Sequence, residues 1–120
     1  MDSPPGTTAW QVNWHAEAML ELKALMDMRE ARAIADAIAK LQVEGPMLGW
    51  PHSSAVRGPL GRGLRELRPR AGRSRWRPIY ERTGANHLTV LSIAPEAVID
   101  PRGFRQGIQR ASARRDEGRQ

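Results

Sequence analysis

The sequence predicts an α+β domain: two N-terminal helices packed on one face of an antiparallel sheet of about four strands, followed by a short C-terminal helix. Apolar residues recur at helical spacing over residues 16–41, and apolar and polar residues alternate, as in strands, at 10–14 and 64–82. Glycine and proline separate these segments. The order strand, helix, helix, three strands, helix would place the helices on one face of the sheet and leave the other face partly open.

The N-terminal half contains one strand and two helices. Tryptophan and valine alternate with glutamine and asparagine at residues 10–14, and residues 16–28 then follow a helical period. A second helix is predicted to begin after Asp27, which forms a capping box with Glu30. The Gly-Pro pair at 45–46 is a strong stop signal, so this helix ends there.

The C-terminal half supplies the rest of the sheet and the last helix. After a loop over residues 47–63, we predict an antiparallel meander of three consecutive strands, at 64–70, 75–82 and 88–94. Asp100 followed by Pro101 is typical of an N-cap and a first helical position. A short helix is therefore expected after Asp100.

The bulk composition limits the class of protein. The length of 120 residues suits one domain, expected at residues 9–113, between a disordered lead at 1–8 and a flexible polar tail at 114–120. The lead lacks the features of a signal peptide, and no apolar run approaches the roughly 20 residues that span a bilayer. The chain has no cysteine, and its three histidines show no ligand spacing. We therefore expect a cytoplasmic protein without a metal or another cofactor.

The positive charge of the chain is concentrated in one segment. Residues 57–82 contain nine arginines against two acids, a net charge of +7, while the whole chain carries +6. Arginine outnumbers lysine seventeen to two, which favours planar, bidentate contacts with phosphate. Because this segment is also predicted to form paired strands, an arginine-covered sheet face suited to RNA or DNA is expected.

Several side chains are candidates for contact with RNA. Three are arginines of the basic segment, and the fourth is a tryptophan in the preceding loop that can stack on a base: Arg65, Arg73, Arg75 and Trp50.

The chain resembles the RelE/ParE superfamily of bacterial toxins from toxin–antitoxin systems, and within it the HigB-like, phage-associated group. The resemblance covers residues 10–111. It is carried by the order of the predicted elements and by three strings: Pro51-His52-Ser53, Gly63-Leu64-Arg65-Glu66-Leu67-Arg68 and Trp76-Arg77-Pro78-Ile79-Tyr80. It implies a RelE-like fold and a toxin that cleaves mRNA on the ribosome as a metal-independent endoribonuclease. It also implies neutralisation by a cognate antitoxin, usually a helix-turn-helix protein.

The resemblance also implies site residues. Arg77 matches the basic position that RelE-type enzymes place against the scissile phosphate, and Arg68 and Arg70 match basic positions on the preceding strand. On this basis the replacement Arg77→Ala is expected to abolish cleavage and leave the fold intact. His52 and Glu96 are the candidate acid–base groups.

Two other functions stay open. The lysine-rich run that relatives carry after the last strand is missing at residues 93–100, where the only charged residues are Glu96 and Asp100. The chain could therefore be a ParE-like inhibitor of DNA gyrase, or a catalytically weakened protein that binds RNA or the ribosome. The basic segment could equally be a solvated face that keeps the protein soluble or holds an acidic antitoxin.

Overall fold

The computed structural model describes residues 10–119. The chain forms three α-helices and five strands, in the order β1 (Gln11–Trp14), α1 (Ala16–Lys23), α2 (Met28–Glu44), β2 (Ser53–Ala55), β3 (Arg65–Leu67), β4 (Trp76–Gly84), β5 (His87–Pro95) and α3 (Pro101–Glu117). Three short 3₁₀ turns complete the chain: η1 (Gly45–Met47), η2 (Pro59–Gly61) and η3 (Pro69–Gly72). None of the helices in the described part has the length and apolar character needed to cross a membrane.

The sheet has five strands and is mixed, which corrects the prediction of about four antiparallel strands. The strand order is β1-β5-β4-β3-β2, and β1 runs parallel to β5 whereas the other pairs are antiparallel. The additional strand is β2, only three residues long, within the segment expected to be a loop. Its sequence Ser-Ser-Ala has no alternation of apolar and polar residues, so the pattern gave no strand signal.

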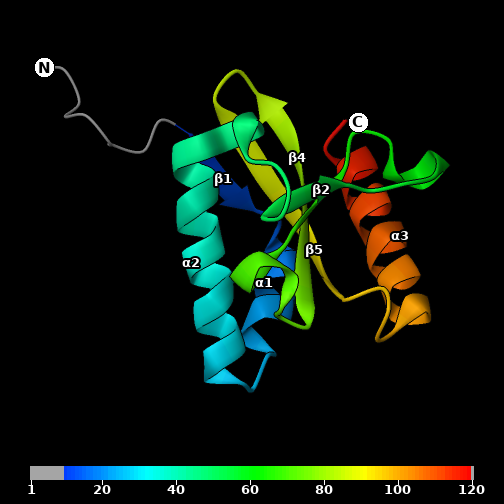
Figure 1. Ribbon diagram of the computed structural model, residues 1–120. Helices are drawn as coiled ribbons and strands as arrows, with labels where there is room; N and C mark the ends of the chain where they lie inside the picture. Colours follow the sequence, from blue (N-terminus) through cyan, green and yellow to red (C-terminus); the bar gives the residue numbers. More distant parts are fainter. Residues whose placement is uncertain (1–9, 120) are drawn as a thin grey trace, which may run out of the picture.

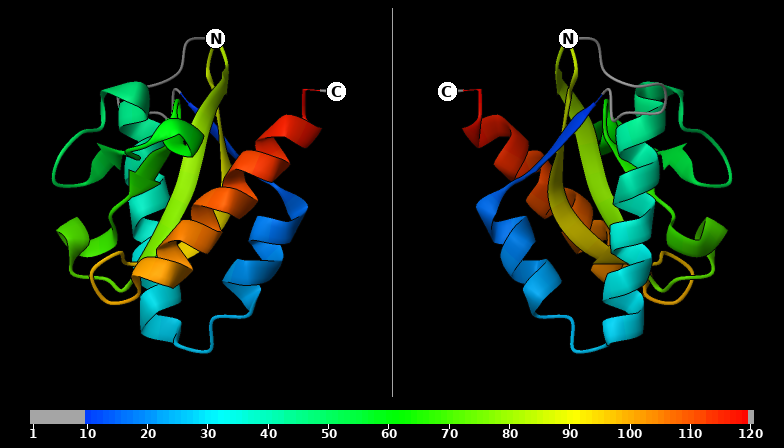
Figure 2. Two further views of the ribbon diagram at one scale, coloured as in Figure 1. Left: turned by 90° about the vertical axis from the view of Figure 1, so that its right-hand side faces the viewer. Right: turned by 90° about the vertical axis from the view of Figure 1, so that its left-hand side faces the viewer.

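Both faces of the sheet are covered, in contrast to the predicted open face. Helices α1 and α2 lie on one side and α3 lies on the other, as Figures 1 and 2 show. One buried cluster joins Ala18 and Leu41 from the first two helices to Tyr80 of β4. A second cluster joins Ile79, the neighbouring residue of β4, to Ile108 of α3. Successive residues of a strand point to opposite faces, which explains this division.

The helix starts agree with the sequence. Asp27 caps α2 by accepting hydrogen bonds from the backbone N–H groups of Arg29 and Glu30, and Asp100 caps α3 by accepting one from Gly103. The predicted capping box is incomplete, because the Glu30 side chain instead accepts a hydrogen bond from Ser74.

The element ends differ in three places. Helix α1 stops at Lys23, earlier than expected, and β3 stops at Leu67, because η3 begins where the strand was expected to continue. Helix α3 continues to Glu117, so most of the segment expected to be a flexible tail is helical. The expected disordered lead over residues 1–8 lies outside the described residues.

Candidate nucleic-acid interface

Arg77 lies inside the protein, where only 2% of its surface is exposed. Its Nη2 donates to the carbonyl of Gly72 at 3.0 Å, its Nη1 donates to the carbonyl of Ser74, and its Nε lies 3.8 Å from a carboxylate oxygen of Glu66. Burial lowers the pKa of Arg77; the Glu66 charge opposes this shift and the Arg68 charge adds to it. The guanidinium therefore holds the η3 turn and the Glu66 carboxylate in place, and it does not stand at the surface.

Glu66 is the acceptor around which two arginines gather. Arg68 donates to one of its oxygens from Nη1 at 3.4 Å, and the hydroxyl of Ser54 donates to the same oxygen at 3.0 Å. Arg77 approaches the other oxygen. Arg68 and Arg77, two of the three arginines that the resemblance implies as site residues, therefore both contact Glu66.

Arg68 is held by hydrogen bonds and lies against an exposed aromatic side chain. Its Nε donates to the carbonyl of Pro51 at 3.0 Å, and its guanidinium lies 4.1 Å from the centre of the Trp50 ring. Trp50 itself is 72% exposed. A large aromatic ring that stays in solvent against an arginine is suited to stack on an unpaired base, while the cation attracts the neighbouring phosphate.

The other predicted contacts lie apart from this cluster. Arg65 donates from Nε to the hydroxyl of Ser53 at 2.9 Å, at the edge formed by β2 and β3. That hydroxyl also bonds to the hydroxyl of Tyr80, so this tyrosine is a buried core residue. Arg75 is exposed, and its guanidinium lies 5.7 Å from the ring of Trp76.

The two acid–base candidates are separated. Glu96 follows β5 and accepts hydrogen bonds from the backbone N–H groups of Val98 and Ile99, at 2.9 and 3.1 Å. Its backbone N–H donates to the carbonyl of Arg75 at 2.8 Å, and it lies two residues after Ala94, which pairs with Arg77. Its charge opposes the lowering of the Arg77 pKa. His52 instead lines a cleft between α2 and η3.

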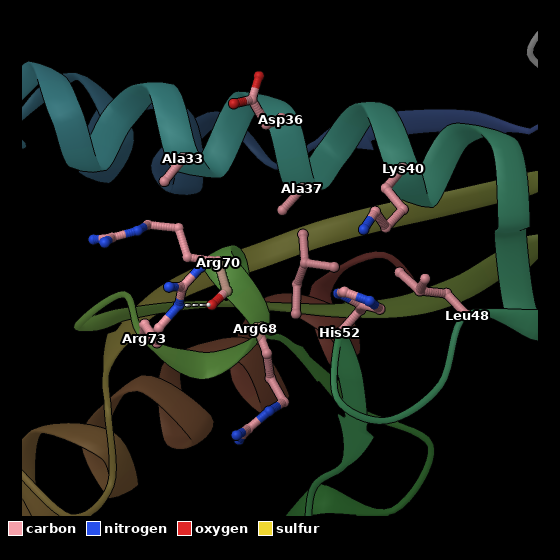
Figure 3. A pocket seen from close by; sticks show the side chains of 11 residues that line it. Ala33, Asp36, Ala37, Lys40, Leu48, His52, Arg68, Arg70 and Arg73 are labelled. Atoms are coloured by element: carbon pink, nitrogen blue, oxygen red, sulfur yellow. Dashed lines mark hydrogen bonds between the residues drawn. The ribbon is translucent and has the colours of Figure 1, made fainter.

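That cleft brings together residues from three parts of the chain. Arg70 and Arg73 come from the η3 turn, His52 from the start of β2, and Lys40 from α2, as Figure 3 shows. Arg70 therefore does not join Arg68 and Arg77, with which the sequence had grouped it, because the chain turns at η3. Lys40 was missed by the sequence reasoning, since a lone lysine on a helix gives no signal of its own.

Two other charged groups have shifted pKa values, and both contact α3. Burial tends to raise the pKa of Glu21, but the hydrogen bond from Arg114 and the N–H of Ile93 outweigh it, so this pKa is lowered. Burial raises the pKa of Glu81, although Arg119 and Arg115 oppose the shift. In the described part of the chain, no group of three or more histidines and acids is placed to hold a metal ion.

Solved structures similar to this chain include a toxin and a toxin–antitoxin complex. A mutant of E. coli toxin RelE in the free state shares 14% identity, covering 85% of this chain and 97% of its own, with a TM-score of 0.58. The toxin–antitoxin complex RelBE2 from Mycobacterium tuberculosis shares 19% identity, with 73% and 99% covered and a TM-score of 0.56. The YoeB-YefM complex from Staphylococcus aureus shares 15%, with 70% and 93% covered and a TM-score of 0.54. The TM-scores establish a shared fold, as the sequence resemblance predicted.

The family follows from a direct match. The family model described as "Phage derived protein Gp49-like (DUF891)" matches residues 20–94, which is more than half of the chain. The chain therefore belongs to the Gp49-like family. No curated protein has a sequence that matches it.

Proposed function

We propose that this protein is the toxin of a type II toxin–antitoxin system, of the HigB-like group, and that it cleaves mRNA on the ribosome as a metal-independent endoribonuclease in the cytoplasm. The observation that carries the proposal is the cluster of Arg68, Glu66 and Arg77 beside the exposed Trp50. It offers a fixed cation and a stacking ring side by side. Membership of the Gp49-like family and the toxin fold of its structural neighbours support the same function.

The chemistry needs three contributions. A base must take the proton of the ribose 2′-hydroxyl, the charge on the pentavalent phosphate must be stabilised, and the leaving 5′-oxygen must receive a proton. Arg68 would bind the phosphate while Trp50 stacks on a neighbouring base. Arg77 would act through Glu66 and η3 as a positioning residue, because its guanidinium is buried. Glu96 is the proposed base, because it lies two residues after Ala94, which pairs with Arg77. The proton that it takes from the 2′-hydroxyl would then pass to the leaving 5′-oxygen.

The decisive experiment is primer extension on an mRNA in a purified translation reaction. Wild-type protein should produce cuts inside codons only when ribosomes are present. Arg68→Ala should reduce cutting by about 10²-fold, the range for removing one group that stabilises transition-state charge. Arg29→Ala, which removes an exposed arginine at the start of α2, should cut like wild type. An mRNA left intact by the wild-type protein would overturn the proposal.

The neutralising partner is proposed to be a helix-turn-helix antitoxin encoded beside this gene. The proposal draws on two structural neighbours that are toxin–antitoxin complexes, YoeB-YefM and RelBE2. Expression of this chain alone should stop growth, and co-expression of the neighbouring gene should restore it and yield a complex on size-exclusion chromatography. Growth arrest that the neighbour does not relieve would count against this partner.

One observation favours a second candidate, ParE-like inhibition of DNA gyrase. The segment after β5 that is basic in RelE-like relatives carries no lysine or arginine at residues 96–100 here. Another structural neighbour is described as a YoeB/ParE toxin from Agrobacterium tumefaciens, at 18% identity and a TM-score of 0.54. A supercoiling assay decides: full gyrase activity at excess protein removes this candidate.

A further inference from the structure

The cleft between α2 and η3 is not part of the cluster around Glu66. It has a volume of about 300 Å³, at the lower end of the range for small-ligand sites. Arg68 borders it but directs its guanidinium away, as Figure 3 shows. Arg77 sits on the face of β4 that carries Ile79, which packs against α3, whereas Leu67 in the cleft belongs to the α2 side. Arg68 is thus the residue that connects two separate surfaces.

The floor of the cleft is apolar and built from small or buried side chains. Ala33 and Ala37 line it from α2, and Leu48 and Leu67 complete its apolar lining. The two alanines are four residues apart, so they lie on the same stripe of the helix. A flat aliphatic floor of this kind accepts a planar ring, and it offers no hydrogen-bonding group that would select among bases.

Both ends of the cleft carry cations or a histidine. Arg70 and Arg73 stand at one end, and Lys40 and His52 at the other, as Figure 3 shows. The only acid in the lining, Asp36, turns its carboxylate away from the cleft. Three positive charges, on Arg70, Arg73 and Lys40, therefore surround an apolar floor. A matching ligand has an apolar central part and negatively charged groups at its ends.

The backbone that presents the arginines is strained. Arg70 and Ala71 have φ of 57° and 55°, in the left-handed region that residues other than glycine rarely occupy, and Gly72 follows with φ of 92°. Such positions persist where the surroundings hold them, and they concentrate at ligand sites. Here the buried Arg77 holds the turn through Gly72 and Ser74. The position of Arg70 at the cleft is thus maintained by a charged group in the interior.

We propose that this cleft binds one unpaired nucleotide of the RNA substrate, with the base on the Ala33–Ala37 floor and a phosphate on Arg70 and Arg73. The proposal rests on the function proposed above. RNA is favoured over an acidic protein segment for two reasons. Charged side chains stand at both ends of the short cleft, which suits a short unit and not a long helix. Arg68 borders the cleft and its guanidinium lies against Trp50, so a single strand could pass from one surface to the other.

The first test fills the floor. Ala37→Leu keeps a residue that favours helices and places extra carbons where the base would lie, whereas Ala39→Leu makes the same change on an exposed position of α2 outside the cleft. Binding is measured by fluorescence anisotropy with a labelled 2′-O-methyl oligonucleotide, which has no free 2′-hydroxyl to react. Ala37→Leu should weaken binding about tenfold, a loss of about 1.4 kcal/mol, because the leucine side chain would occupy the space of the base. Ala39→Leu should bind like wild type.

The second test changes charge and does not depend on packing. The chain has only two lysines, so Lys40→Glu at the cleft and Lys23→Glu at the end of α1 alter the net charge equally. Lys40→Glu should weaken binding at least fivefold more than Lys23→Glu. Equal losses from the two variants would show that only the overall charge matters, which would overturn the cleft site.

The outcomes separate this inference from the proposed function. If wild type cuts mRNA and Ala37→Leu binds the oligonucleotide equally well, the cleft inference fails and the nuclease stands. If Ala37→Leu binds RNA normally but escapes its antitoxin, the cleft holds a protein segment and the inference also fails. If Ala37→Leu and Lys40→Glu weaken oligonucleotide binding as expected but the wild-type protein does not cut mRNA, the cleft inference stands and the proposed nuclease activity is wrong.

Discussion

At the scale of single residues, Arg77 combines full burial with a charge that must be balanced. Its partners are the carbonyls of Gly72 and Ser74 and the carboxylate of Glu66. Arg77→Ala would leave the carbonyls of Gly72 and Ser74 without this donor and would remove one of the two arginines beside Glu66. We therefore expect a loss of roughly 3–5 kcal/mol in the free energy of unfolding, measured by urea denaturation. The expectation that this replacement spares the fold is thereby revised.

A neighbouring arginine provides the control for this prediction. Arg75 is exposed and has no carbonyl or carboxylate partner in the described part of the chain, so Arg75→Ala should change the free energy of unfolding by less than about 0.5 kcal/mol. An Arg77→Ala protein as stable as Arg75→Ala would show that water satisfies the exposed carbonyls. Loss of cleavage in Arg77→Ala can be assigned to chemistry only after this measurement.

The sequence could indicate which residues belong to the candidate site, but not how deeply each side chain is buried. The strings around Arg68 and Arg77 identified both arginines, and the two do meet at Glu66. Burial depends on what lies above a residue, and η3 covers Arg77 through contacts with Gly72 and Ser74. The alternation of residues along a strand does not show which other segment covers a side chain. For this reason the sequence suggested that Arg77 lies at the surface.

At the scale of elements, α3 approaches β5 through a glycine. A Cβ on Gly107 would overlap the Cβ of Ala94 and come within 3.1 Å of its Cα, and the hydroxyl of Ser92 donates to the Gly107 carbonyl at 2.8 Å. Gly107→Ala should therefore push the helix off the strand and lower the free energy of unfolding by about 1–2 kcal/mol, despite the gain in helix propensity. Thermal unfolding followed by circular dichroism measures the change.

The matched control lies at the end of the same helix. Gly118 has φ of −68°, and a Cβ there would meet only an ordinary contact, so Gly118→Ala should be neutral or slightly stabilising. Destabilisation of the two variants to the same extent would show that glycine is needed in α3 for a reason other than its contact with Ala94.

Glu21 of α1 links three elements through one carboxylate. It accepts hydrogen bonds from the N–H of Ile93 on β5 at 2.8 Å and from Nε of Arg110 on α3 at 3.2 Å, and Nη2 of Arg114 forms an ion pair with it at 2.6 Å. Glu21→Gln should lower the free energy of unfolding at pH 7 by about 1–3 kcal/mol, since two arginines lose their counter-charge.

The pH dependence gives this prediction a second readout. Because the pKa of Glu21 is lowered in the folded state, its contribution is complete above the unfolded value of 4.5 and is lost as the pH falls through the folded pKa. The difference between wild type and Glu21→Gln, measured by urea denaturation, should hold from pH 7 to about pH 5 and shrink below pH 4.5. A constant difference down to pH 3 would contradict the assignment.

The element order followed from the sequence wherever a strong local signal existed. The caps at Asp27 and Asp100 were correct because a side chain bonds to the nearby backbone, which is a local interaction. Strand β2 and the position of α3 could not be found this way. β2 is held by pairing with β3, and α3 covers the sheet through contacts with Ile79 and Leu91, which are distant in sequence.

At the scale of the whole molecule, charge is divided between two regions. Residues 57–82 carry +7 and the whole chain +6, so the remaining residues together carry −1. The basic segment spans β3, η3 and most of β4, and it therefore supplies both the Arg68 cluster and the arginines of the α2–η3 cleft. One segment thus supplies arginines to both surfaces, as the proposed path of a single RNA strand requires.

This division predicts a measurable salt dependence. Arg70 and Arg73 would share one phosphate, and Arg68 and Lys40 would each contact another, so about three phosphates would be neutralised. Affinity for single-stranded RNA should therefore fall roughly twenty-fold between 50 and 200 mM salt, the slope expected for release of counterions from a single strand. Lys40→Ala should reduce the slope of log K against log salt by about 0.7. Anisotropy titrations with an uncleavable oligonucleotide at four salt concentrations would measure both slopes. A slope near zero would mean that stacking on Trp50 and the alanine floor carries the binding, and that the arginines serve a different partner.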